Sequence, residues 1–281
     1  MKRINAIEIH EQSWFPKSIR DGVTDALQAV LRLGGVYQPV VWHLVRALNS
    51  VGATKLIDLC SGGGGPWIWL HRTLARQKDG PLNIQLTDKF PNLAAFQRAE
   101  QITNGRISYC AESIDATKIP PRLHGFRTMF TSFHHFTPTQ ASAIIQSAIE
   151  NRQGIGIFEV PARTMLSILL TFFVPLLALF AVPFVRPFRL SLLLWTYALP
   201  VIPFVLWFDG IVSCLRAYSR EELSAMVSDL GTNDYTWEIG EESGWIAPVT
   251  FMVGYPPSSN NADGIDGKLL QFAIPDFTRP K

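Results

Sequence analysis

A run of four glycines lies in the segment LIDLCSGGGGPWIWL, residues 56–70, between two apolar stretches. The stretch before the glycines has the length and residue types of a buried strand, and the stretch after them has those of a helix. Ligands of parallel α/β sheets bind beyond the carboxyl ends of the strands. Glycines there let the main chain approach the ligand closely. The segment therefore predicts a ligand-binding turn.

Three classes of ligand compete for this turn. A phosphate-binding P-loop ends in Gly-Lys-Ser/Thr, whereas Pro66 and Trp67 follow the glycines here, so we exclude it. A dinucleotide fold requires a third glycine for close helix packing, and bulky Trp67 occupies that position. No tyrosine has a lysine four residues later, which removes one large reductase pattern. S-adenosylmethionine, with a carboxylate and an ammonium but no phosphate, is the remaining class.

Three aspartates stand at or after the ends of three successive strand-like runs. Asp58 lies in KLIDL, Asp88 follows LNIQLT, and Asp115 follows RISYC within a short loop. Because the carboxyl ends of parallel strands share one edge of a sheet, we expect these carboxylates at the same edge. Each has a simpler alternative, since Asp58 and Asp88 could cap helices and Asp115 could be an ordinary turn residue.

These residues resemble the motifs of the class I S-adenosylmethionine-dependent methyltransferases. IDLCSGGGG matches their h-G-x-G-x-G loop at Asp58, Gly62 and Gly64, and it departs at Cys60, where the family usually has glycine. The resemblance covers roughly residues 50–160 and 210–255. It implies a Rossmann-like fold and S-adenosylmethionine as the cofactor.

The resemblance also implies roles for individual residues. Asp58 would lie near the methionine ammonium, Asp88 would bind both ribose hydroxyls, and Asp115 would lie near the adenine amino group. Two acceptor oxygens on Asp88 suit two neighbouring hydroxyl donors. The other cofactor residues that it implies are Cys60, Ser61, Gly62, Gly64, Lys89 and Ser132.

The segment FTSFHHFTPTQ after the fourth strand supplies candidate catalytic residues, His134 and His135. A histidine titrates near neutral pH and could remove a proton from a hydroxyl or amine as the methyl group arrives. Alternatively, one histidine packs and the other caps the next helix. Many methyl transfers also need little beyond alignment and desolvation, because the sulfonium is already activated.

Candidate substrate residues are Glu159, which closes the fifth strand, and the aromatic pair Trp14 and Phe15 in IHEQSWFP. The aromatics lie before the first helix, where the family often has a lid over the cofactor. A hydrophobic contact with the core is the alternative for this pair.

Short apolar strands alternate with helices along the chain. The strand-like runs are residues 55–59, 82–87, 106–110, 127–133, 154–160, 235–239 and 247–255. Helical patterns fall at residues 19–33, 39–48, 66–77, 92–103, 138–151 and 219–230. This order predicts an α/β fold, a Rossmann-like seven-stranded, mostly parallel sheet with helices on both faces and an N-terminal helical lid.

Composition excludes several classes of protein. The chain has 281 residues and a net charge of +2, which is too small to indicate a nucleic-acid partner. Three scattered cysteines argue against a disulfide framework or a cysteine metal site and favour a reducing compartment, and we expect no metal. The N-terminus has no apolar core that would indicate a signal peptide.

Residues 164–208 form an almost wholly apolar insert. Residues 164–185 and 190–208 carry no charge and each reaches the length of a membrane span, with Arg186 and Arg189 between them. Prolines interrupt both runs, and a spanning hairpin would place the arginines on the far side of the membrane. We expect two proline-broken helices that lie on one leaflet. A true span and burial in the protein or in a homodimer interface remain alternatives.

The expected organisation is an N-terminal helical cap over residues 1–50, a core over residues 51–163 and 209–255, the hairpin insert over residues 164–208, and a loose tail over residues 256–281. We expect methyl transfer from S-adenosylmethionine to a hydrophobic small molecule or lipid on the cytoplasmic side of a membrane. The alternatives are a non-catalytic membrane-bound scaffold with this fold and, less favoured, a nicotinamide-dependent oxidoreductase.

Overall fold

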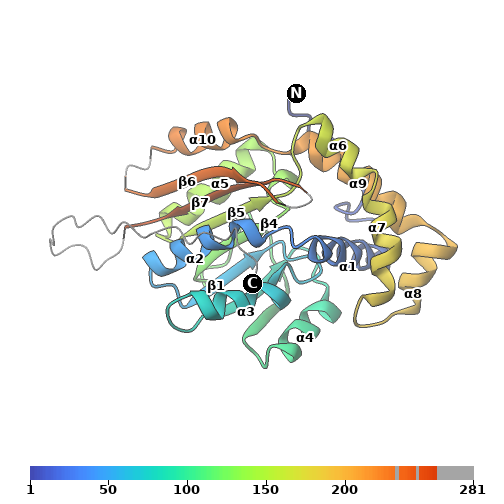
Figure 1. Ribbon diagram of the computed structural model, residues 1–281. Helices are drawn as coiled ribbons and strands as arrows, with labels where there is room; N and C mark the ends of the chain where they lie inside the picture. Colours follow the sequence, from blue (N-terminus) through green and yellow to red (C-terminus); the bar gives the residue numbers. More distant parts are fainter. Residues whose placement is uncertain (232–233, 245–246, 258–281) are drawn as a thin grey trace, which may run out of the picture.

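A seven-stranded sheet forms the centre of the protein (Figure 1). The computed structural model describes residues 1–231, 234–244 and 247–257. The strands are β1 Lys55–Leu59, β2 Asn83–Asp88, β3 Ile107–Ser113, β4 Phe126–Phe130, β5 Ile155–Glu159, β6 Thr236–Glu242 and β7 Val249–Tyr255. Their order is β3-β2-β1-β4-β5-β7-β6. Among the described strands, β7 alone runs opposite to the other six, so the predicted mostly parallel α/β sheet is confirmed.

Helices cover both faces of the sheet, as predicted (Figure 1). One face carries α2 Val41–Ser50, α3 Trp67–Gln77 and α4 Leu93–Ile102, and the other carries α5 Pro138–Glu150 and α10 Arg220–Asp229. Successive strand residues point to opposite faces. Leu56 of β1 therefore joins the core under α2 and α3, whereas Ile57 joins the core under α5 and α10.

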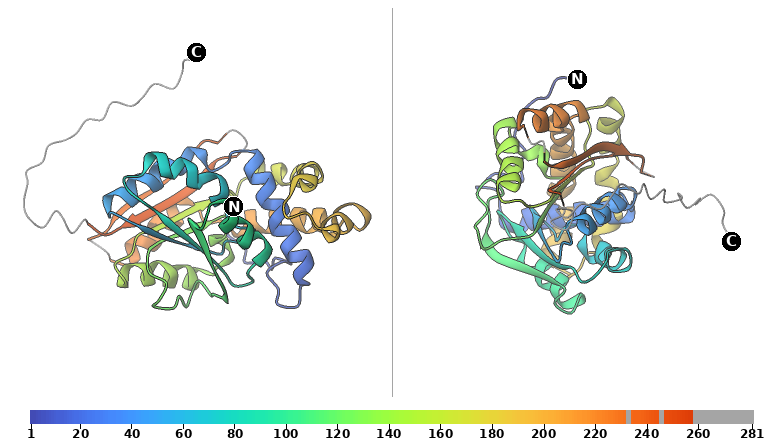
Figure 2. Two further views of the ribbon diagram at one scale, coloured as in Figure 1. Left: turned by 90° about the horizontal axis from the view of Figure 1, so that it is seen from below. Right: turned by 90° about the vertical axis from the view of Figure 1, so that its left-hand side faces the viewer.

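A third layer lies beyond one end of the sheet (Figures 1 and 2). It contains α1 Lys17–Leu33 and the insert helices α6 Met165–Thr171, α7 Val174–Ala181, α8 Leu190–Leu193 and α9 Val201–Arg216. Buried residues of α1 such as Val23 and Ala26 share a core with Ala178 of α7 and with Ile202 and Val205 of α9. The N-terminal region is thus divided, because α1 packs on the insert while α2 packs on the sheet.

Prolines of the insert lie where a helix begins or turns. Pro175 and Pro203 occupy the first turns of α7 and α9, Pro200 is the N-cap of α9, and Pro183 lies in a 3₁₀ turn. A proline in a first turn removes no intrahelical hydrogen bond. The two apolar runs are therefore helical but broken, as the sequence indicated. The second run continues past residue 208, because α9 extends without a break to Arg216. Of the predicted tail, residues 258–281 lie outside the described part.

Candidate active site

A cavity of about 550 Å³ lies between the loops at the carboxyl ends of the strands and the third layer. The glycine loop and the turns after β2, β3 and β4 form one wall. The opposite wall is apolar and comes from α1 and the insert, through Val23, Leu27, Leu170, Phe173, Val174, Leu177 and Leu206. The cavity thus joins a polar wall built by the sheet to an apolar wall built by helices.

The glycine loop follows a path that few residues other than glycine can adopt. Gly62, Gly64 and Gly65 have φ angles of 50°, 101° and 56°, and Cys60 has 56°. A Cβ atom at Gly63 would lie 2.9 Å from the carbonyl oxygen of Thr24 on α1, so this glycine permits close contact between the loop and the third layer. Cys60, Ser61 and Gly62 line the cavity, whereas Gly64 does not, and cofactor binding by these residues stays a prediction.

Asp58 lies beneath this loop rather than on the cavity wall. Its side chain is buried, with one carboxylate oxygen accepting a hydrogen bond from Ser61 Oγ at 2.7 Å and the other accepting from Thr128 Oγ1 at 2.7 Å. Burial raises the pKa of Asp58 to about 7, despite these hydrogen bonds. Asp58 therefore connects the loop to β1 and β4 through these hydrogen bonds. The contact between Asp58 and the methionine ammonium, which the resemblance implies, stays a prediction.

Asp88 and Asp115 both line the cavity, together with Lys89 and Ser132. The carboxylate of Asp88 accepts hydrogen bonds from the main-chain N–H groups of Gly62 and Phe90, each at 2.7 Å. Asp115 accepts from the main chain and hydroxyl of Thr117. Burial alone would raise the pKa of Asp115, but these hydrogen bonds lower it. Both residues therefore present carboxylates that a bound ligand can contact.

A hydrogen bond connects Ser132, in the turn after β4, to Glu159 at the end of β5. Glu159 is buried behind the cavity, where one carboxylate oxygen accepts from the N–H groups of Ser132 and Phe133, each at 2.8 Å. Its other oxygen contacts His134 Nδ1. Burial would raise the pKa of Glu159, but the histidine and the two amides lower it. The Ser132 hydroxyl has no hydrogen-bond partner within the described structure, so it is free to meet a ligand.

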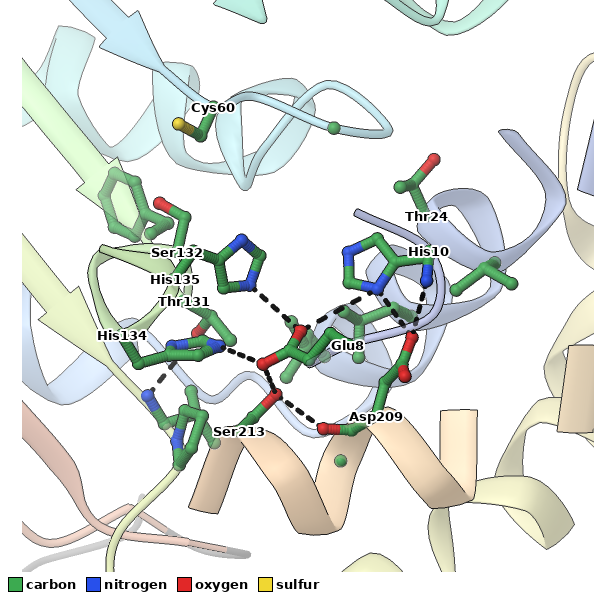
Figure 3. Close-up of a pocket in the computed structure, with 18 of the residues that line it drawn as sticks. Glu8, His10, Thr24, Cys60, Thr131, Ser132, His134, His135, Asp209 and Ser213 are labelled. Carbon is green, nitrogen blue, oxygen red and sulfur yellow. Dashed lines mark hydrogen bonds and ion pairs between the residues drawn. The ribbon is translucent and has the colours of Figure 1, made fainter. Parts of the chain in front are cut away.

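His134 and His135 meet a cluster of carboxylates from the N-terminal segment (Figure 3). His134 Nε2 lies 3.6 Å from Glu8 Oε1, and His135 Nε2 lies 3.3 Å from Glu8 Oε2. His135 Nδ1 lies 2.7 Å from Glu11 Oε1, and Arg216 donates to the other oxygen of Glu11 at 2.8 Å. All of these side chains except Arg216 line the cavity.

This environment changes the expected protonation of His135. Burial lowers the pKa of His135, but the carboxylates of Glu8 and Glu11 outweigh that effect and raise it to about 9. Burial likewise raises the pKa of Glu11, whereas His135 and Arg216 lower it well below its usual range. In the ligand-free protein His135 is therefore a cation at neutral pH. The predicted proton removal by His134 or His135 remains open, and His135 would first have to lose a proton.

Trp14 and Phe15 do not line the cavity. Trp14 is 71% exposed, and Phe15 is buried in the core that α1 shares with the insert. Phe15 therefore corresponds to the alternative of a hydrophobic contact, whereas Trp14 neither lines the cavity nor joins the core. Between Trp14 and the chain start, Glu8, His10 and Glu11 turn into the cavity instead.

Sequence reasoning missed Glu8, Asp209 and Ser213, which complete the polar cluster. Asp209 on α9 accepts from the main-chain N–H groups of Ile9 and His10 and contacts His10 Nδ1 at 2.7 Å. Ser213, one turn further along α9, donates to Glu8 at 3.0 Å. Asp209 stands in the otherwise apolar segment VLWFDGIV. A lone carboxylate in such a run is a signal of a specific buried partner.

Comparisons with known proteins find methyltransferases among the solved structures that are similar to this chain. No protein-family model and no curated protein matches the chain. An O-methyltransferase family protein from Burkholderia thailandensis is 18% identical with a TM-score of 0.47, over 84% of this chain and 60% of that one. An O-methyltransferase of neocarzinostatin biosynthesis, in complex with S-adenosylmethionine and 2-hydroxy-5-methyl naphthoic acid, is 14% identical with a TM-score of 0.45.

The second alignment covers 81% of this chain and 55% of the other. An S-adenosylmethionine-dependent methyltransferase from Aquifex aeolicus is 13% identical with a TM-score of 0.44, over 79% of this chain and 92% of that one. The chain thus spans little more than half the length of the first two proteins. Similarity of this size describes an arrangement of elements, so the function of this chain must be argued from its own site.

The buried carboxyl of Asp58 predicts a specific dependence of stability on pH. Its pKa rises from 3.8 to about 7 on folding. The stability that its neutral form contributes is therefore fully present below the unfolded pKa and is lost as the pH rises through about 7. The unfolding free energy of the wild type, minus that of Asp58→Asn, should fall by roughly 2–4 kcal/mol between about pH 4.5 and about pH 8. Urea unfolding at several pH values measures this difference, and a difference independent of pH would show that Asp58 stays ionised.

Proposed function

We propose that this protein transfers the methyl group of S-adenosylmethionine to a hydrophobic acceptor, and that it does so at a membrane surface. The observation that supports the proposal most directly is the joining of two walls in one cavity. The glycine loop, Asp88 and Asp115 come from three successive strand ends and line one wall, while α1 and the insert line the other with apolar side chains.

The polar wall suits S-adenosylmethionine better than a nucleotide with phosphates. The loop provides close main-chain approach at Cys60, Ser61 and Gly62, and the carboxylates of Asp88 and Asp115 can accept from hydroxyl and amino donors. Two carboxylates on this wall would repel a phosphate. Trp67 is fully buried where a dinucleotide fold needs a glycine. These features disfavour the alternative of a nicotinamide-dependent oxidoreductase.

The apolar wall suits a hydrophobic acceptor and continues to the outer surface. Phe173 and Leu177 line the cavity, and they are also 58% and 38% exposed. A small molecule dissolved in a membrane could therefore reach the cavity along the insert without crossing water. The sulfonium is already activated, so alignment of such an acceptor in a dry cavity supplies much of the required catalysis.

The outer face of the insert has the composition of a membrane-contact surface. Six of its exposed large side chains are Phe172, Phe173, Phe180, Phe184, Phe188 and Leu190. Residues Met165–Phe184 have the length and hydropathy of a membrane span, and only 22% of the most apolar stretch is buried. The bent pair Leu190–Ala198 and Val201–Arg216, which meet at 73°, also passes that test together.

Contact with one leaflet fits this geometry better than a span. The helices are short, break at prolines and bury their inner faces against α1, so they remain part of the protein. Arg189 is paired with Asp25, whereas Arg186 is exposed between Phe184 and Phe188 and meets no carboxylate among the described residues. An arginine beside exposed aromatics suits the phosphates at a bilayer surface. We propose the cytoplasmic side of a membrane as the location, with a homodimer through the same face as the alternative.

Replacement of Asp88 tests the cofactor assignment. Asp88→Ala should weaken S-adenosylmethionine binding by roughly 1.5–3 kcal/mol, because it removes hydrogen bonds to a charged acceptor. Isothermal titration calorimetry of the folded variant measures the change. Asp79→Ala, an exposed carboxylate on the chain between α3 and β2, is the matched control and should bind like the wild type.

An unchanged affinity in Asp88→Ala would contradict the assignment. Titration of the wild type with NADPH adds a second check, because the proposal predicts no binding heat. Binding of NADPH in place of S-adenosylmethionine would support the oxidoreductase alternative.

The membrane face can be tested without disturbing the core. Phe180 and Phe184 are 75% and 79% exposed, so Phe180→Asp combined with Phe184→Asp should fold normally. Burial of a phenylalanine side chain contributes about 1.5–3 kcal/mol, so the double variant should lose at least tenfold in affinity for liposomes. Flotation with vesicles containing anionic lipid measures this, and Leu33→Asp, which is on the end of α1 and 70% exposed, is the control.

Wild-type protein that is monomeric without detergent and does not float with vesicles would contradict membrane contact. A stable dimer that the double variant separates into monomers would instead show that a second copy covers this face.

A further inference from the structure

The side chains around Glu8 include potential metal ligands that the proposed methyl transfer does not require. Glu8 comes from the N-terminal segment, and His134 and His135 follow β4, so no sequence pattern joins them. In the structure one ligand atom from each of these three residues lies within 4.8 Å of the other two. We propose that Glu8, His134 and His135 bind a divalent transition-metal ion on the wall of the cavity.

The distances between these atoms suit a shared ion. Nε2 of His134 lies 3.6 Å from one carboxylate oxygen of Glu8, and Nε2 of His135 lies 3.3 Å from the other. Ligand atoms at about 2.0–2.2 Å from a tetrahedral ion are themselves roughly 3.3–3.6 Å apart. Each histidine therefore already lies at the spacing from Glu8 that a shared ion requires.

Both histidines are oriented as metal ligands usually are. Nδ1 of His134 contacts Glu159, whose other carboxylate oxygen already accepts two main-chain N–H groups. Nδ1 of His135 contacts Glu11, whose other oxygen accepts from Arg216. Each Nδ1 therefore donates to a carboxylate, which leaves Nε2 to face Glu8, and a metal ion that binds there would displace the second proton of His135. Carboxylate–histidine–metal arrangements fix the ring and its tautomer in this way.

The atoms that would hold the ion have unmet bonding capacity. Glu8 is 0% exposed, and its Oε2 atom and Nε2 of His134 are buried without a hydrogen-bond partner in the described structure. Nε2 of His134 faces the other carboxylate oxygen, Oε1, which already accepts from Ser213 at 3.0 Å. Buried polar atoms without partners are unfavourable, and a cation bound to Glu8 and His134 would remove this cost. Figure 3 shows the Glu8 carboxylate in the centre of the cluster, with both histidines directed toward it.

The donor set indicates which ions fit. Two imidazole nitrogens with one carboxylate suit Zn²⁺, Fe²⁺, Co²⁺ or Ni²⁺, whereas Mg²⁺ and Ca²⁺ prefer oxygen ligands. All three residues line the cavity, so a fourth position on the ion would face the bound molecules. An ion there could polarise an acceptor oxygen, and that consequence alone rests on the proposed methyl transfer. The binding site itself does not depend on it.

Direct titration tests the site. Full-length protein without a polyhistidine tag, stripped with a chelator, is titrated with Zn²⁺ by calorimetry and with Co²⁺ by visible absorption. The proposal predicts one ion per chain and a Co²⁺ spectrum of a four- or five-coordinate ion. Glu8→Gln and His135→Ala should each weaken Zn²⁺ binding at least 100-fold. His124→Ala, which changes an exposed histidine outside the cavity, should bind like the wild type.

Thermal unfolding distinguishes a variant that has lost Zn²⁺ binding from a variant that does not fold. Zn²⁺ should raise the Tm of the wild type and of His124→Ala but not that of a folded Glu8→Gln. Glu159→Gln, which keeps the shape but weakens the orientation of His134, should reduce affinity about 10–100-fold. Absence of Zn²⁺ binding in the wild type, or equal binding in Glu8→Gln, would overturn the proposal and leave the cluster as an ion-pair network. Because the test measures only metal binding, its result does not depend on whether the protein binds S-adenosylmethionine.

Discussion

The burial of one carboxylate beneath the glycine loop is the constraint on which the rest of the site depends. Asp58 lies one residue before the end of β1 and is 1% exposed, and it accepts hydrogen bonds from Ser61 in the loop and Thr128 in β4. Burial makes its charged form unfavourable, which raises its pKa to about 7. These hydrogen bonds hold the loop in left-handed backbone conformations, and the loop lines the cavity. Asp58 thereby helps to fix the shape of the polar wall, together with Asp88, which accepts from the N–H group of Gly62.

A second constraint comes from the helices that close the cavity. The third layer is attached to the sheet by polar contacts as well as by its apolar core. Asp25 of α1 accepts from Asn92 at 2.9 Å and pairs with Arg189 of the insert. Burial and the charge of Asp21 raise the pKa of Asp25 to about 7, although Arg189 opposes them. Arg216 of α9 donates to the carbonyl oxygens of His134 and His135, so the last insert helix is fixed to the turn after β4.

Under the proposed function, these two constraints would bring the cofactor and the acceptor together in one cavity. The sheet positions the loop, Asp88 and Asp115, while α1 and the insert add a mainly apolar wall, which also includes Arg20, Asp21 and Asp209. The same insert helices expose their other side. The insert could therefore both form part of an acceptor site and contact a membrane. Membrane contact would then bring the cavity close to acceptors dissolved in the bilayer.

Much of the sheet and its polar wall could be predicted from sequence, because those features follow local patterns. KLIDL is β1, and the capping box of Ser219 and Glu222 starts α10. Three acids at strand ends reach one edge because parallel strands require it. Contacts between distant segments could not be predicted in this way. Trp14 is exposed whereas Glu8 is fully buried, although both lie in the same N-terminal segment, because Glu8 finds its partners on α9 and after β4.

The most direct test of the central claim is transfer of a labelled methyl group. Full-length protein is incubated with S-adenosylmethionine labelled on the methyl carbon and with liposomes that contain a total lipid extract. Label in the organic phase is then compared with the S-adenosylhomocysteine released. The account predicts equal amounts of both, with transfer that requires the lipid phase. Tight binding of S-adenosylmethionine without S-adenosylhomocysteine or labelled lipid-phase product would contradict methyl transfer and identify a non-catalytic protein that retains the fold.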